Sequence, residues 1–103
     1  METRLKIMPD SCGSYDYFAF QGNIDALAED ELKELPRKVQ RPLVKLDFSK
    51  TGRINSMGIA LLLRCLKTIR EEKKAEIRLI QPSPMNAMLF KMTGLFLLAD
   101  LEK

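Results

Sequence analysis

The sequence lacks the residues from which most catalytic and metal sites are built. Histidine is absent from its 103 residues, so the commonest general base near neutral pH is missing. Its two cysteines, Cys12 and Cys65, lie far apart in the sequence and form no CxxC pair, which argues against a zinc site. Both are expected to be free thiols, Cys65 as a small core residue in a helix and Cys12 in a turn. We therefore expect no bound metal and no cofactor.

Long hydrophobic runs are also absent. The longest, from Met57 to Leu63, falls far short of the roughly 20 residues that a membrane-spanning helix needs. The first residues lack the apolar core of a signal peptide. We therefore expect a cytoplasmic protein without membrane contact.

The sequence has no tryptophan, two tyrosines and five phenylalanines, and none of them falls in an RNA-binding motif. Its net charge of +3 comes from basic residues concentrated between Arg37 and Arg53, after an acidic stretch from Asp25 to Glu34. Nucleic-acid binding would need a denser basic stripe with interleaved aromatics, so it is not expected. The two charged stretches either orient a protein partner or are ordinary solvated surface.

Hydrophobic periodicity predicts the order strand, strand, helix, strand, helix, strand, helix. The predicted strands are 4–8, 15–21, 43–48 and 76–80, and the predicted helices are 24–38, 56–73 and 85–92. The first two strands are expected to form a hairpin, and the near-continuous apolar run at 43–48 suggests a strand covered on both faces. Residues 49–53 read as a polar loop, Pro36 can end the first helix, and 95–101 could be a strand or a helix.

A chain of this length and composition forms one domain, residues 1–103. Strand-helix-strand units favour parallel neighbours joined by right-handed crossovers. We therefore predict an α/β fold with a four- or five-stranded mixed sheet and helices packed mainly on one face.

The stretch Asn55-Ser56-Met57-Gly58 is the first candidate site, because it opens the longest predicted helix. A phosphate on Ser56 would meet free backbone N–H groups and the positive end of the helix dipole. A serine here can equally be a simple helix cap, as can Asn55. Met57, Leu61 and Cys65 follow at spacings of four. They either pack under the last helix or leave an apolar patch beside Ser56.

A second candidate is Gly22-Asn23-Ile24-Asp25, where Asn23 or Asp25 can cap the first helix. This turn and the Ser56 turn both follow strands of one sheet, so they could lie together. Catalysis is not expected, because Ser56 has no histidine base and no GxSxG, GxGxxG or P-loop pattern is present.

Four ordered stretches, FQGNID, LVKLDFSK, INSMGIALLL and IRLIQPSPMNAMLFKMTGL, resemble the STAS domain of bacterial anti-sigma factor antagonists. That family typically has Gly-x-(Leu/Ile)-Asp after its second strand, which Gly22 to Asp25 match. It also has Asp-Ser-x-Gly at its key loop. Here Ser56 and Gly58 match, and Asn55 stands in place of the usual Asp.

The resemblance implies that Ser56 is the phosphorylatable serine of a partner-switching pathway. The unphosphorylated chain would bind an anti-sigma factor that is also a serine protein kinase, and a PP2C-type phosphatase would reverse the modification. The residues implied in partner binding are Asn23, Asp25, Arg53, Asn55, Ser56, Met57, Gly58 and Leu61. The alternative is a constitutive docking subunit, for instance of a transporter, that is not phosphorylated. A small-molecule or nucleotide sensor is a third possibility, without a phosphate-cradling glycine loop to support it.

Overall fold

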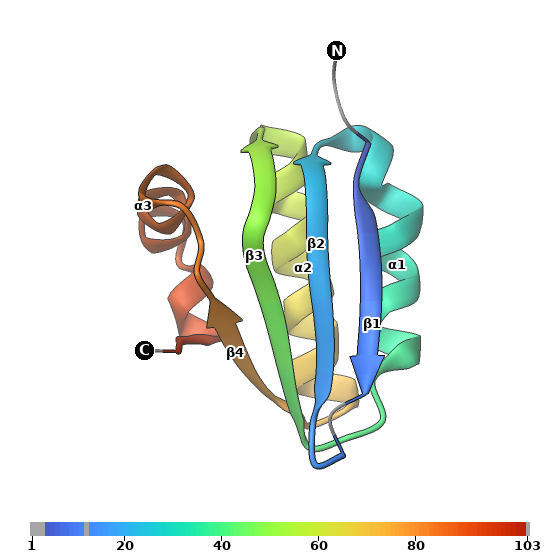
Figure 1. Cartoon of the computed structure of the whole chain (residues 1–103). Coiled ribbons are helices and arrows are strands. Elements are labelled where there is room, and N and C mark those ends of the chain that lie inside the picture. Colours follow the sequence, from blue (N-terminus) through green and yellow to red (C-terminus); the bar gives the residue numbers. More distant parts are fainter. Residues whose placement is uncertain (1–3, 12, 103) are drawn as a thin grey trace.

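Five strands form one mixed sheet in the computed structural model, which describes residues 4–11 and 13–102 (Figure 1). The strands, which pair in this order, are β1 (Lys6–Ser11), β2 (Asp16–Ile24), β3 (Leu43–Ile54), β4 (Glu76–Ile80) and β5 (Asp100–Leu101). β1 and β2 are antiparallel, whereas all the later pairs are parallel. The predicted α/β class, the mixed sheet and the N-terminal hairpin are confirmed. Cys12 lies outside the described residues.

Helices α1 (Glu29–Lys38) and α2 (Ser56–Glu72) cover one face of the sheet, and α3 (Pro84–Thr93) lies beyond β4 (Figure 1). A short 3-10 turn, Ala26–Ala28, precedes α1, and its cap is Asp25, whose Oδ1 accepts the Leu27 amide at 3.0 Å. Helix α1 continues two residues past Pro36, so the proline does not end it there.

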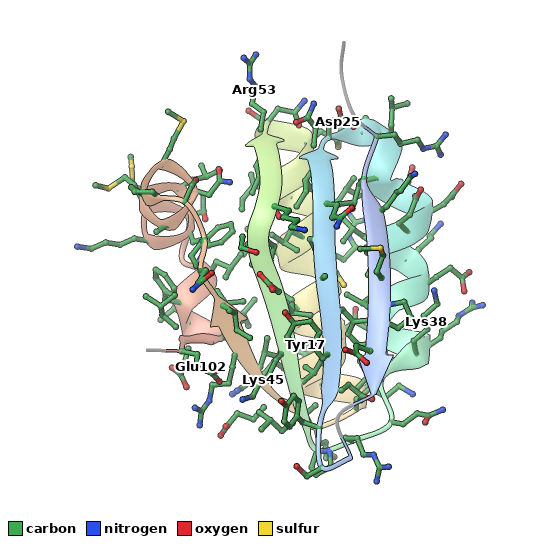
Figure 2. All side chains as sticks on the ribbon, in the orientation of Figure 1. Tyr17, Asp25, Lys38, Lys45, Arg53 and Glu102 are labelled. Atoms are coloured by element: carbon green, nitrogen blue, oxygen red, sulfur yellow. The ribbon has the colours of Figure 1, made fainter. Side chains whose placement is uncertain are left out.

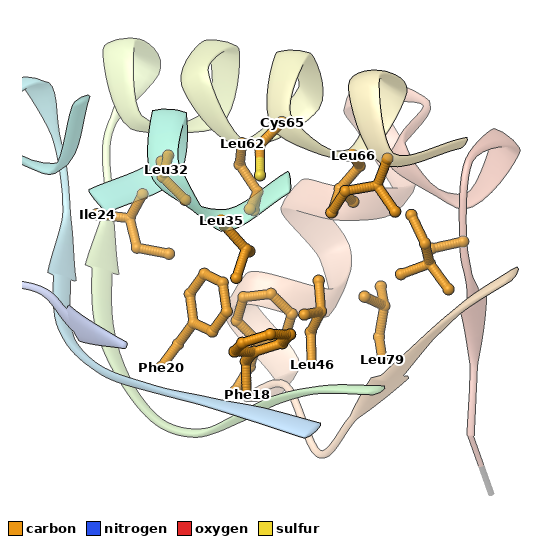
Figure 3. Close-up of a cluster of buried hydrophobic side chains, with 14 of the residues drawn as sticks. Phe18, Phe20, Ile24, Leu32, Leu35, Leu46, Leu62, Cys65, Leu66 and Leu79 are labelled. Carbon is orange, nitrogen blue, oxygen red and sulfur yellow. The ribbon is translucent and has the colours of Figure 1, made fainter. Parts of the chain in front are cut away.

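The core lies between the sheet and helices α1 and α2 (Figure 3). Phe20 of β2 meets Phe48 of β3 with ring centroids 4.9 Å apart, and Phe48 meets Phe90 of α3 at 5.3 Å. Helix α3 is thus joined to the core by an aromatic chain. Cys65 of α2 is buried on the side that faces α1, as predicted for a core residue, and burial raises the pKa of its thiol to about 12.

Strand β3 differs from its prediction in two ways. It extends through residues 49–53, the predicted polar loop, because that stretch still pairs with β2. It is also not covered on both faces: Val44, Leu46 and Phe48 are buried under the helices, whereas Lys45 and Asp47 lie half-buried on the opposite side (Figure 2).

Polar side chains cover that opposite face (Figure 2). Tyr17 donates a hydrogen bond to Asp47. Lys45 pairs with Glu102 at 3.0 Å and sits 4.4 Å from the ring centroid of Tyr15. Lys45 therefore interrupts the apolar run of β3 because it belongs to the open face.

Helix α3 begins and ends as its sequence indicates. Ser83 caps it by accepting the Asn86 amide at 3.1 Å, Pro84 is its first residue, and Gly94 ends it with a φ of 82°. Residues 95–101 form a 3-10 turn, Leu95–Leu97, and then the short strand β5. Among the described residues, no helix combines the length and apolar character needed to cross a bilayer.

Candidate functional site

Three chain segments meet at one end of the sheet: the end of β2, the end of β3 and the start of α2. The Asn55 amide donates to the Ile24 carbonyl at 3.2 Å, and the Arg53 amide donates to Asn23 Oδ1 at 2.8 Å. These two bonds place the end of β2, which runs through Gly22 and Asn23 to Ile24, directly against the start of α2. The proximity expected from the strand order is therefore present.

Asn55, rather than Ser56, caps α2. Its Oδ1 accepts the Gly58 amide at 2.8 Å, and its carbonyl accepts the Ile59 amide at 2.9 Å. Ser56 is the first helical residue and is exposed. The hydroxyl of Ser56 is thus presented to solvent at the helix N-terminus, while its neighbour performs the capping.

Gly58 allows α2 to begin directly on the backbone of β2. A Cβ at this position would lie 1.9 Å from the Ile24 carbonyl oxygen and 3.0 Å from the Asp25 nitrogen. Any larger residue would push the helix away from the strand. Gly58 therefore fixes the position of Ser56, two residues earlier, relative to the end of β2.

The pairing of β2 with β3 shifts register twice after Asp47. At each shift, β3 has one residue more than the segment of β2 that it pairs with. The second lies beside Gly52 and Arg53. A Cβ on Gly52 would lie 2.3 Å from Asn23 Oδ1, so the Asn23 side chain occupies the space that glycine leaves open. Asn23 thus holds the end of β3, and Arg53 projects from it into solvent (Figure 2).

Asn86 of α3 is a further structural residue of this site that sequence reasoning missed. Its Nδ2 donates to the Gly52 carbonyl at 3.1 Å, and the residue is only 5% exposed. The available signal was a polar residue three and four positions before Leu89 and Phe90, on one face of a helix. Asn86 ties the N-terminal end of α3 to the end of β3.

The residues predicted to bind a partner fall into three groups. Arg53, Asn55, Ser56 and Met57 are exposed, with Met57 at 53%. Asn23 and Asp25 are half-buried: the Asn23 side chain accepts the Arg53 amide, and the Asp25 side chain accepts the Leu27 amide. Gly58 is buried.

Leu61 differs from the rest of the predicted set. It is only 9% exposed and lines the groove between α1 and α2, so its side chain is not part of the exposed surface around Ser56. The idea that Leu61 and Cys65 pack under the last helix is wrong, because their neighbour is α1.

The exposed group has the chemistry of a recognition surface. A hydroxyl, a thioether and a guanidinium are presented at one end of the molecule, where Arg53 and Asp25 are labelled in Figure 2. The amides of the first turn of α2 that lack intrahelical acceptors can receive an anion there. In the described part of the chain, no three side chains are grouped so that they could hold a metal ion.

Residues 15–102 match the family model described as "STAS domain". Comparison with curated protein sequences gave no match.

Solved structures of anti-sigma factor antagonists share the fold. The unphosphorylated form of SpoIIAA aligns with a TM-score of 0.72 at 16% identity, covering 95% of this chain and 89% of that one. An antagonist from Mycobacterium paratuberculosis aligns with a TM-score of 0.75 at 16% identity, covering 94% and 84%. The phosphorylated form of the Bacillus protein SpoIIAA gives 0.62 at 14% identity, covering 95% and 92%.

Proposed function

The chain belongs to the STAS domain family, and from that membership we propose that it is a cytoplasmic bacterial anti-sigma factor antagonist that works by partner switching. Its unphosphorylated form binds an anti-sigma factor of the serine-kinase type and so frees a sigma factor. The observation that carries the proposal is the exposed Ser56 at the first position of α2, beside an Asn55 that caps the helix without it.

Phosphorylation would act through charge. The Ser56 hydroxyl attacks the γ-phosphate of ATP held by the kinase, ADP leaves, and the hydroxyl proton passes to a base of the kinase. The product carries about −1.5 to −2 additional charges near neutral pH. An interface that buries exposed Met57 must then also desolvate the phosphate, and a loss of about 3 kcal/mol weakens binding more than 100-fold. A PP2C-type phosphatase reverses the step by hydrolysis.

The fold is suited to such a switch because Ser56 has no structural task that phosphate would abolish. The cap hydrogen bond belongs to Asn55, and the Ser56 side chain is exposed. The helix dipole favours negative charge at this end of α2. The modification can therefore change what a partner meets without unfolding the chain.

The test combines the purified chain, ATP and the kinase-type anti-sigma factor encoded beside its gene. Mass spectrometry should locate phosphate on Ser56 alone. Ser56→Ala should bind the partner and stay unmodified, whereas Ser56→Glu should weaken binding strongly. Ser14→Glu is the matched control, because Ser14 is an exposed serine between β1 and β2, at the opposite end of the sheet, and the same charge there should have little effect. Phosphate on another residue, or undiminished binding by Ser56→Glu, would refute the switch.

One observation favours a second candidate, a docking subunit that is never phosphorylated. Asn55 is neutral where the family usually has an aspartate, and its cap is complete without any phosphate. Neighbouring genes for a transporter instead of a kinase and phosphatase would support this candidate. A stable complex with the protein encoded by the neighbouring gene, which ATP does not dissociate, would also support this candidate.

A further inference from the structure

Helix α3 exposes its methionines. Met85, Met88 and Met92 recur on one face of the helix and are 80%, 57% and 77% exposed. The buried residues of this helix are instead Asn86 and Phe90. Figure 2 shows sulfur-bearing side chains of α3 projecting away from the sheet. We call Met85, Met88 and Met92 the methionine face.

The composition of α3 suits a protein groove better than a lipid surface. Lys91 is the one charged residue among Pro84–Thr93, whereas helices that lie on membranes carry several basic residues and bulky aromatics. Methionine side chains are flexible and polarizable, so they adapt to apolar protein surfaces. A helix with an apolar face of this kind is typically received by an apolar groove.

The size of the methionine face argues against a dimer built on it alone. Leu97, 86% exposed, adjoins its C-terminal end. Full burial of a methionine or leucine removes roughly 100 Å² of apolar surface from water, so these four side chains offer about 300 Å². Two copies would bury about 600 Å², well below the roughly 1,200 Å² of a stable interface. A stable contact made through this face must therefore extend beyond it.

The rest of that contact is adjacent. Asn86 anchors the N-terminal end of α3 to the Gly52 carbonyl, and Gly52 directly precedes the exposed Arg53. Ser56 and exposed Met57 follow within five residues of Gly52. One buried hydrogen bond thus holds the start of α3, where Met85 lies, against the end of β3 that leads to Ser56.

We propose that the protein that docks over Ser56 also receives the methionine face of α3 in an apolar groove. This rests on the proposed function only in that a protein partner covers Ser56. The partner's identity as an anti-sigma factor is not required. Binding strength would then come from α3, and the phosphorylation switch from Ser56.

The experiment places a photoreactive amino acid in the full chain at position 57, 88 or 8 and cross-links in the native cell. Met8 is the matched control, a 42%-exposed methionine on β1 at the opposite edge of the sheet. Positions 57 and 88 should capture the same protein, and position 8 should not. Capture at 57 without capture of that protein at 88, a second copy of the chain at 88, or no protein at 88 would overturn the proposal.

A binding measurement with the captured protein completes the test. Replacing Met85, Met88 and Met92 together by Gln should weaken binding at least 10-fold with an unchanged melting curve, whereas Met8→Gln should not weaken it. Equal binding by the triple variant would overturn the proposal even if Ser56→Glu abolishes binding. Conversely, if 57 and 88 capture one protein that is not an anti-sigma factor, the proposed function fails and the role of α3 stands.

Discussion

Asn55 and Ser56 have separate tasks at the start of α2. Asn55 accepts the Gly58 amide, whereas the Ser56 side chain is exposed. Asn55→Ala should therefore lower the free energy of unfolding by about 1 kcal/mol, and Ser56→Ala should change it by less than about 0.5 kcal/mol. Urea denaturation measures both. Equal losses for the two variants would mean that the serine shares the cap.

At Gly58, helix propensity and packing predict opposite effects of an alanine substitution on stability. Glycine to alanine within a helix normally stabilises by up to about 1 kcal/mol. Here the new Cβ would lie 1.9 Å from the Ile24 carbonyl, so Gly58→Ala should destabilise by more than about 2 kcal/mol. Ala60→Gly, at an exposed position of the same helix, is the control and should lose only about 1 kcal/mol. A stabilised Gly58→Ala variant would show that α2 does not rest on β2.

Asp47 makes one contribution to stability depend on pH. Burial tends to raise the pKa of Asp47, but hydrogen bonds from Tyr17 and Ser49 outweigh it, so the pKa is lowered. A lowered folded-state pKa gives stability that is present above the unfolded-state pKa, near 4, and is lost as the pH falls through the folded-state value.

Tyr17→Phe should accordingly cost about 1 kcal/mol at pH 7, and the difference from the parent chain should narrow as the pH drops below about 4. Denaturant midpoints measured from pH 7 to pH 2.5 give the comparison. In an Asp47→Asn background, the effect of Tyr17→Phe should no longer vary with pH over this range. A pH-independent difference in the parent chain would rule out the Asp47 carboxylate as its source.

At the scale of elements, α3 is attached to β3 through two buried residues. Asn86 donates a hydrogen bond to Gly52, and Phe90 contacts Phe48. Asn86→Ala leaves the Gly52 carbonyl without this donor and should cost about 1–3 kcal/mol. In the Asn86→Ala variant, the rate of amide hydrogen exchange should increase in α3 more than in α2. The exposed neighbour Met85→Ala should change stability by less than about 0.5 kcal/mol, and an equal effect of both variants would contradict the tether.

The elements themselves were largely predictable because their signals are local. Alternation identified β1, β2 and β4, and a near-continuous apolar run identified β3, whereas β5 was left undecided between strand and helix. The cap and stop residues of α3 identified that helix, and the stripe of α2 identified the longest one. Strand β3 was cut short at Phe48 because residues 49–53 are polar, yet pairing with β2 extends it to Ile54. Hydrogen bonding to a neighbouring strand does not depend on hydrophobicity, so no local pattern could show it.

The site was predictable in part. Ser56 was identified by its place at a helix start and by family resemblance, and the stretch 22–25 by its composition. The roles of Asn23 and Asn86 could not be predicted. Each side chain makes a hydrogen bond to the backbone of β3, at a residue about 30 positions away in the sequence. The methionine face followed the same rule: helical spacing shows that the three residues share a face, but only the neighbours of α3 decide that it is the exposed one.

For the whole molecule, phosphorylation should change binding without changing the fold. The net charge of +3 falls to about +1 on modification, a modest change for a chain of this size. The phosphate would sit at the helix end that favours negative charge. The phosphorylated chain should therefore melt within about 4 °C of the unmodified chain, a shift that corresponds to about 1 kcal/mol or less. A much larger drop in melting temperature would show that the switch works by local unfolding.

By itself, the sequence determined the α/β class, the order of the elements and the serine at the start of α2, because periodicity and helix-end preferences act over a few residues. Only the tertiary structure decided the surroundings of Ser56. Asn55 caps α2, Gly58 lets α2 pack against the Ile24 carbonyl, and Asn86 bonds α3 to the end of β3. These outcomes depend on the packing of neighbouring segments in the folded chain, and local sequence patterns do not show which segments become neighbours.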